Sequence, residues 1–222
     1  MARFVSSRPD RAIVSLCRTK TATYLQTMAD HTANELRTPK LLDIETWCIQ
    51  QLIRGAADPK SAFHWPVLCT AGPVPHGRVV VFRKFLPEER QIILYTDART
   101  QKVKDLEHQP VAECVFYDPR KSVQIRASGI VTVLTSGNDR DQHFQALRPD
   151  RRGDYSTQLA PGQPVDLIEQ ASVTDPDLAE QNFCLIRIQV TSIDWLKLDR
   201  SGHARARFYW RSDEVTRQWS VP

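Results

Sequence analysis

The stretch from Arg78 to Gly129 constrains the fold more than any other part of the sequence. It alternates β-type runs with turns and one short predicted helix, Arg99–His108. Gly129, in the middle of its last run, predicts a β-bulge or a close backbone approach. Short runs joined by hairpin-type turns favour antiparallel pairing. Strands are predicted at Arg78–Phe85, Gln91–Thr96, Val111–Tyr117 and Ser122–Leu134.

Elements on both sides of this stretch complete the expected fold. Leu41–Ala57 is predicted to be a helix, because apolar residues recur on one of its faces. Asp139–Leu147 is predicted to be a second peripheral helix. Further strands are expected at Trp65–Ala71, Phe183–Leu198 and His203–Trp210, the last of these ending the sheet. This order favours a mainly β (α+β) fold, an antiparallel sheet or barrel with peripheral helices, over a parallel βαβ sheet.

Length and charge limit the classes of function. A chain of 222 residues fits one domain, preceded by a basic, Ser/Thr-rich tail at residues 1–28 that is expected to be poorly ordered. That tail also has the composition of an import sequence, so organelle import stays open beside the expected cytoplasmic location. No apolar run reaches the length of a membrane span. The net charge of +4 is spread out, which favours anionic small molecules over nucleic acid and membranes as partners.

Common catalytic motifs do not occur in this sequence. It holds no G-x-G-x-x-G, P-loop, H-E-x-x-H or G-x-S-x-G, and its histidines and five cysteines show no metal-ligand spacing, so no metal site is expected. Basic, hydroxyl and amide side chains instead fringe the predicted strand ends. This pattern suggests a bound anionic cofactor, although solvated surface charges are the plainer alternative. The residues are Arg78, Thr96, Arg99, Thr100, Lys102 and Gln124.

An ordered series of short motifs resembles the pyridoxamine 5′-phosphate oxidase-like proteins. The series is R-V-V-V-F-R, L-Y-T-D, K-V, F-Y-D-P and Q-I-R-A-S-G, and the likeness covers Trp65–Gly129 and Phe183–Pro222. The resemblance implies that residues 29–222 form a six- to seven-stranded antiparallel split β-barrel that binds FMN. It also implies a homodimer with FMN at the interface between the subunits.

The resemblance assigns roles to individual residues. Arg83, Arg205 and Arg207 are implied to act in catalysis by orienting a small anionic substrate. Cofactor contacts are implied for Arg78, Val79, Val80, Val81, Phe82, Arg83, Tyr95, Thr96, Arg99, Thr100, Gln101, Lys102, Gln124, Leu196 and Arg207.

Two positions and one short segment depart from the family pattern. Gln101 replaces an arginine, a charge that Arg99 could supply, and Leu196 replaces an aromatic residue. The oxidases' final R-x-H-D-R is matched by His203–Arg207, which reads H-A-R-A-R. The cofactor half of the site therefore matches the family better than the substrate half.

An FMN-dependent oxidoreductase of a less characterised branch is the first hypothesis. A non-catalytic module that binds FMN or another ligand is the alternative, and an empty structural barrel is the third.

Overall fold

The computed structural model describes residues 40–211 and 214–222, so the predicted tail at residues 1–28 lies outside the described residues. Its helices are α2 Leu41–Ala57, α3 Gln101–His108, α4 Asn138–Gln145, α5 Pro149–Arg152 and α6 Leu178–Asn182, with 3₁₀ turns η2 Ala62–His64, η3 Gly153–Tyr155 and η4 Ile168–Ser172. Its strands are β1 Val67–Ala71, β2 Pro75–Val79, β3 Lys84–Leu86, β4 Gln91–Asp97, β5 Val111–Asp118, β6 Val123–Leu134, β7 Phe183–Lys197, β8 Ala204–Arg211 and β9 Glu214–Ser220.

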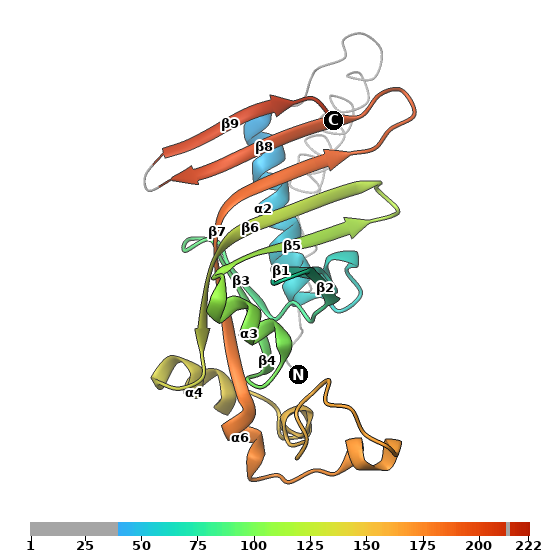
Figure 1. The fold of residues 1–222 in the computed structure, drawn as a ribbon. Helices are drawn as coiled ribbons and strands as arrows, with labels where there is room; N and C mark the ends of the chain where they lie inside the picture. The colour runs from blue at the N-terminus through green and yellow to red at the C-terminus, as the bar shows by residue number, and fades with distance from the viewer. Residues whose placement is uncertain (1–39, 212–213) are drawn as a thin grey trace, which may run out of the picture. The chain divides into compact units, whose positions relative to one another are not determined.

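The strands form one antiparallel sheet (Figure 1). Along its main path the order is β2-β1-β5-β6-β7-β4-β3, and β8 and β9 continue from β7 as a branch. Within the described residues the sheet does not close into a full ring, because β2 and β3 end the path without pairing with each other. The mainly β fold of the split-barrel type with peripheral helices is confirmed. The described part holds nine strands rather than six or seven.

Two strand predictions are wrong in detail. Arg78–Phe85 is not one strand, because residues 80–83 leave the β2 ladder: the Val80 amide donates to the Pro66 carbonyl, and the Phe82 amide to that of His64. His203–Trp210 does not end the sheet, since β9 follows β8. Sequence periodicity missed β9 because most of its residues are exposed and give no apolar alternation.

β7 changes its partner along its length, and this change divides the sheet. Its first half lies between β6 and β4, whereas its second half lies between β6 and β8. The register of the β6–β7 ladder shifts between Ser128 and Gly129, which confirms the predicted bulge. A Cβ on Gly129 would lie 2.1 Å from the carbonyl oxygen of Gln189, so only glycine fits this crossing.

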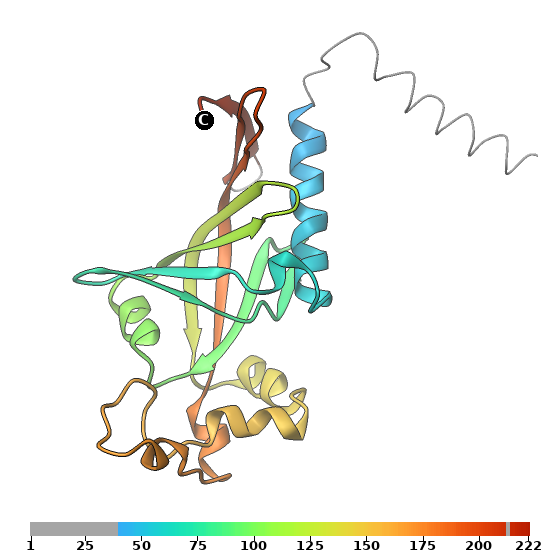
Figure 2. The same cartoon turned by 90° about the vertical axis from the view of Figure 1, so that its right-hand side faces the viewer.

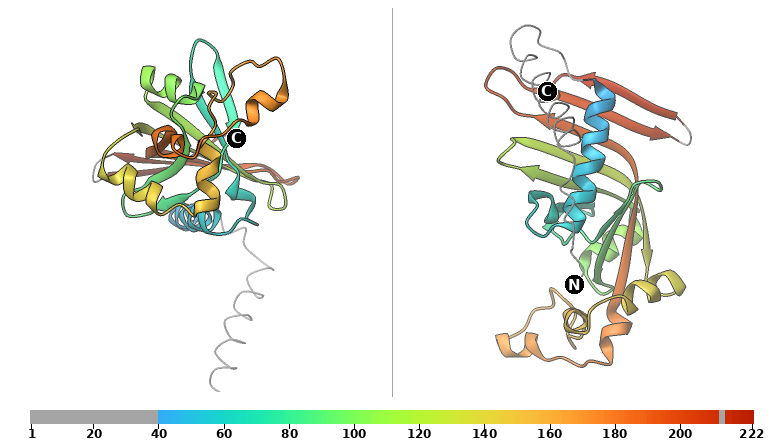
Figure 3. Two further views of the ribbon diagram at one scale, coloured as in Figure 1. Left: turned by 90° about the horizontal axis from the view of Figure 1, so that it is seen from below. Right: turned by 180° about the vertical axis from the view of Figure 1, so that it is seen from behind.

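Two hydrophobic clusters lie on opposite faces of the sheet. The larger packs α2, which lies across the sheet in Figure 3, against the inner side chains of the strands. Cys48 and Leu52 of α2 and Phe116 of β5 are fully buried there. The smaller cluster joins β4 and β7 to α4, η3 and α6, with Phe183 at its centre. No helix in the described ranges is long and apolar enough to cross a membrane.

We expect Gly129→Ala to destabilise the protein by about 3 kcal/mol or more, because a methyl group there overlaps the β7 backbone. Denaturant unfolding monitored by circular dichroism measures the effect. Gly77→Ala is the matched control within a strand, since its new Cβ would meet Val67 at an ordinary 3.5 Å. Equal stability of the two variants would contradict a close crossing at Gly129.

Candidate functional site

The predicted phosphate-binding residues come together where β4 ends and α3 begins. Lys102 donates from Nζ to Thr96 Oγ1 at 2.9 Å, and Thr96 Oγ1 lies 3.4 Å from Thr100 Oγ1. Thr100 in turn donates to the carbonyl of Asp97 at 2.8 Å. Both threonines are buried. The result is an ammonium group held beside two hydroxyls at the first turn of a helix.

Arg78 joins this corner from β2, which lies with β1 beside α3 (Figure 2). Its Nη1 donates to Thr70 Oγ1 at 2.7 Å and to the Leu68 carbonyl at 3.2 Å. Its Nη2 lies 3.7 Å from Asp105 Oδ2. Gln101 is turned toward the same carboxylate, donating to Asp105 Oδ1 at 2.9 Å.

The electrostatics of this corner favour an anion. Burial lowers the pKa of Lys102, and the nearby charge of Arg78 lowers it further. Burial also lowers the pKa of Arg78, although Asp105 opposes that shift. A dianion placed near both cations would favour their charged forms. We call Arg78, Thr96, Thr100 and Lys102 the anion corner.

Arg99, which was predicted to make up for the charge missing at Gln101, is paired with an acidic residue. It forms a two-pronged ion pair with Asp97, with nitrogen–oxygen distances of 3.0 and 2.7 Å. Its remaining donors reach the carbonyls of Thr157 and Gln158 at 2.9 and 3.0 Å. Arg99 therefore fastens the segment after η3 to the end of β4.

Arg83 and Tyr95 lie in a second group, on the face of β4 that carries the smaller cluster. The Arg83 guanidinium lies 5.4 Å from the Tyr95 ring centroid, and the Tyr95 hydroxyl is 2.8 Å from His143 Nδ1. Burial raises the pKa of Tyr95 and, more strongly, that of Tyr155 to about 12, while the nearby Arg83 opposes both shifts. Arg83 Nε is buried and has no hydrogen-bond partner among the described residues.

A third group lies on the outer face of β6, β7 and β8. Gln124, Leu196 and Arg205 stand opposite one another across the three strands. The neighbouring row is Arg126, Asp194 and Arg207, in the same order.

Asp194 is the centre of that second row. It accepts hydrogen bonds from Arg126 at 2.7 Å, from Arg205 at 2.7 to 3.2 Å and from Arg207 at 3.1 Å. Burial would raise the pKa of Asp194, but the bonds from Arg205 and Arg126 outweigh it and lower the pKa. Three arginines around one carboxylate leave this face positively charged.

The predicted cofactor contacts at residues 79–82 differ in how far their side chains are exposed. Val79 is 62% exposed, whereas the Phe82 side chain is fully buried in the larger cluster. Val80 and Val81 are half-buried in the segment that connects β2 to β3. Phe82 can therefore meet a ligand only through its backbone.

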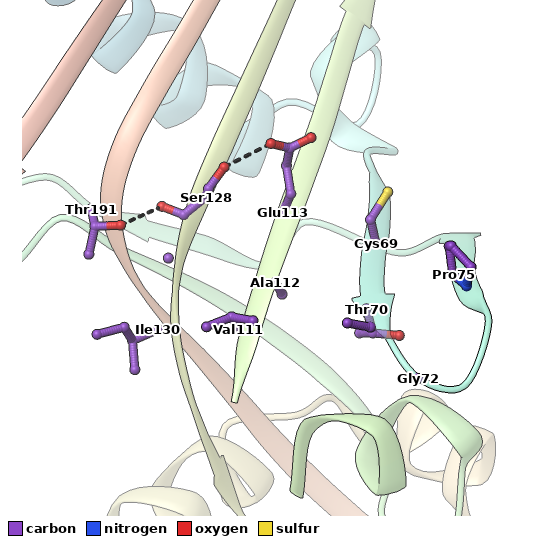
Figure 4. A pocket seen from close by; sticks show the side chains of 12 residues that line it. Cys69, Thr70, Gly72, Pro75, Val111, Ala112, Glu113, Ser128, Ile130 and Thr191 are labelled. Carbon is purple, nitrogen blue, oxygen red and sulfur yellow. Dashed lines mark hydrogen bonds between the residues drawn. The ribbon is translucent and has the colours of Figure 1, made fainter. Parts of the chain in front are cut away.

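An apolar groove of ≈ 460 Å³ lies between β1, β5 and β6. Figure 4 shows Cys69 and Thr70 on one side of it and Ser128 on the other, with Ser128 bonded to Glu113. Val111 and Ile130 border the groove and are 42% and 57% exposed. The groove thus carries exposed apolar side chains at its border.

Three residues next to the anion corner were not predicted from the sequence: Thr70, His76 and Asp105. Asp105 lies four residues after Gln101 on α3, a spacing that places both on one helix face. The other two come from β1 and β2, so only the tertiary fold brings them to Asp105. No side-chain hydrogen bond or ion pair among the described residues joins the three groups to one another.

Two cations and two hydroxyls at the β4–α3 corner of a split-barrel fold form a candidate anion site. Residues 45–135 match the model of a family described as pyridoxamine 5′-phosphate oxidase, FMN-binding domain. The resemblance noted from the motifs is confirmed by this match to an FMN-binding domain.

Individual relatives agree with this assignment. A pyridoxine/pyridoxamine 5′-phosphate oxidase 2 of Arabidopsis thaliana is 28% identical over 134 residues, which cover 56% of this chain and 67% of the relative. The structure of a pyridoxamine 5′-phosphate oxidase-related, FMN binding protein of Nostoc punctiforme PCC 73102 has a TM-score of 0.66 and 25% identity, covering 79% of this chain and 96% of that one. PhzG from Burkholderia lata 383 shares the fold, with a TM-score of 0.59, 16% identity, and coverage of 84% and 95%.

The Asp105 carboxylate predicts a defined dependence of stability on pH. Burial would raise its pKa, but hydrogen bonds from Gln101, Thr70 and His76 outweigh burial and lower the pKa to about 2. A depressed folded-state pKa contributes stability above the unfolded-state value of about 3.9, and this contribution is lost as the pH falls toward 2. We expect Asp105→Asn to be less stable than the wild type by about 2 kcal/mol at neutral pH, with the gap closing between about pH 4.5 and 2.

Urea unfolding of both proteins across this pH range measures the gap. Asp166→Asn, at an exposed aspartate, is the control and should track the wild type throughout. A gap for Asp105→Asn that stays constant with pH would contradict an ionised, hydrogen-bonded Asp105.

Proposed function

We propose that the protein binds FMN through its phosphate at the anion corner and works as an oxidoreductase on a small anionic substrate. One observation carries this proposal. Two cationic side chains, Arg78 and Lys102, lie near each other beside two buried threonine hydroxyls, in a chain that matches an FMN-binding domain. A phosphate near charge −2 matches two cations and a hydroxyl donor.

The chain's own residues suggest how the ligand is held. Arg78 and Lys102 bind the phosphate, and Thr96 donates its hydroxyl hydrogen to it. Thr100, whose hydrogen goes to the Asp97 carbonyl, holds the turn beside the phosphate. The Gln124 amide both donates and accepts, which suits the polar edge of a flavin ring. When bound, FMN supplies the redox chemistry, while the protein supplies position and charge.

Three arginines are proposed to orient the substrate. Among the residues that the structure describes, Arg207 gives only its Nε to Asp194, and its terminal nitrogens are proposed to meet an anionic group. Arg205 gives both Nε and Nη2 to the same carboxylate and is more firmly held. Arg83 lies beside Tyr95 and Tyr155, and its charge is proposed to attract the anionic group from there. Positive charge placed this way would also stabilise a reduced, anionic flavin.

The division of predicted residues into separate groups supports a homodimer. The anion corner lies at the β4–α3 junction, whereas Gln124, Leu196 and Arg207 lie on the outer face of the sheet. We propose that the outer face of one subunit completes the anion corner of its partner. The apolar groove bordered by Val111 and Ile130 supports this, since exposed apolar borders are typical of an interface.

A non-catalytic FMN module is the second candidate. The firm hold of Asp194 on Arg205 favours it, because that arginine has fewer donors left for a substrate. Pyridoxamine 5′-phosphate supplied to the flavin-loaded protein separates the two candidates. Oxidation with oxygen consumption supports the oxidase, whereas loaded protein that reduces slowly or not at all with a panel of small anionic substrates supports the module.

We expect Arg78→Ala and Lys102→Ala each to raise the Kd for FMN by about 30-fold, as the loss of a charge-assisted hydrogen bond implies. Flavin absorbance and fluorescence quenching measure the affinity, with riboflavin as the ligand that lacks the phosphate. Arg148→Ala is the matched control, because Arg148 is highly exposed and pairs only with Asp150 among the described residues. A colourless wild type that takes up no added FMN would refute the proposal.

The interface gives a separate test. Ile130→Asp places a charge on the apolar border of the groove, and we expect it to shift the protein from dimer to monomer and weaken FMN binding at least tenfold. Sedimentation velocity measures the oligomeric state. Ile168→Asp, at a 74% exposed residue of η4, should leave both properties unchanged. A wild-type monomer with full FMN affinity would contradict a shared site.

A further inference from the structure

The Asp105 carboxylate is a buried acceptor of three side-chain hydrogen bonds beside the anion corner. Its side chain is 1% exposed. Oδ2 accepts from Thr70 Oγ1 at 2.7 Å and is 2.9 Å from His76 Nδ1, while Oδ1 accepts from Gln101 at 2.9 Å. The donors come from β1, β2 and α3, so one buried group ties together the three elements around the corner.

Charge and hydrogen supply fix the direction of these bonds. A carboxylate with a pKa near 2 is ionised at neutral pH and can only accept. His76 must therefore carry a hydrogen on Nδ1. Thr70 must donate its only hydrogen to Asp105, which leaves its oxygen free to accept from Arg78. Arg78, Thr70 and Asp105 thus form a directed chain that ends on a buried charge.

The backbone closes over this network. A Cβ added to Gly72, in the turn between β1 and β2, would lie 3.1 Å from Asp105 Oδ1 and 3.3 Å from the His76 ring. The turn thus packs directly against the carboxylate and the imidazole. Arg78 has few ways to move inside such a network, because its Nη1 is also held by the Leu68 carbonyl.

We propose that Asp105, with Thr70 and His76, forms a positioning network that fixes the guanidinium of Arg78 for a phosphate group and so sets the preference for phosphorylated over unphosphorylated flavin. This inference rests on the proposed function, and it says which residues make the anion corner prefer FMN to riboflavin. Asp105 does not touch the phosphate. It keeps Arg78 in one orientation, so less freedom is lost when the phosphate binds.

The test compares FMN with riboflavin on each variant. We expect Asp105→Asn and Thr70→Val to raise the Kd for FMN about tenfold and to leave the Kd for riboflavin within twofold, because an unrestrained Arg78 loses more freedom when the phosphate binds. Thr70→Ser keeps the hydroxyl and should restore the wild-type ratio. The ratio of the two Kd values is measured on the same variant, so any loss of folded protein cancels. Glu45→Gln is the control at another buried carboxylate, which bonds Trp210 and Arg217, and should leave the ratio unchanged.

A second readout does not depend on flavin. Nitrogen-15 NMR of His76 should show the Nδ1–H tautomer in the wild type and its loss in Asp105→Asn. A wild type with the Nε2–H tautomer, or variants that keep the full preference for FMN, would overturn the positioning role while leaving the FMN proposal intact. A wild type that binds neither flavin contradicts the proposed function instead, and the histidine signal then still reports whether the network forms.

Discussion

The crossing of β6 and β7 at Gly129 is the contact on which the rest of the sheet depends. There the carbonyl of Gln189 occupies the space that any side chain would need. The register shift beside it leaves Thr191 without a partner in the β6–β7 ladder. Its hydroxyl donates to the Ser128 carbonyl at 3.3 Å. Beyond this point β7 leaves β4 and takes β8 as its neighbour. The apolar groove, lined by Ser128, Gly129 and Thr191 among others, lies along the same crossing.

Buried or half-buried carboxylates organise the cations of this protein. Asp105 holds Arg78 through Thr70, and Asp97 holds Arg99 against the segment after η3. Asp194 gathers three arginines on the outer face of the sheet. A guanidinium that is already bound on one side has a fixed direction for its remaining donors. The arrangement therefore separates arginines that brace the fold from arginines that have donors left for a ligand.

The sequence predicts those elements whose signal is local. The helix at Leu41–Ala57 is predicted to the residue, because its apolar face repeats at helical spacing. Gly129 indicates a bulge or close approach, since a glycine inside an alternating strand often marks a point where two backbones meet. The break at residues 80–83 escapes prediction because its hydrogen bonds go to Pro66 and His64, a contact no local pattern carries. The Asp105 network escapes it for the same reason: its donors converge only in the folded chain.

β7 contributes to both hydrophobic clusters. Cys184 and Ile186 face the larger cluster, whereas Phe183 and Leu185 face the smaller one. Because both clusters share this strand, one cluster cannot unfold while the other stays folded. The described chain from Lys40 onward should behave as a single cooperative unit, so that damage near α4 and damage near α2 lower the same melting transition.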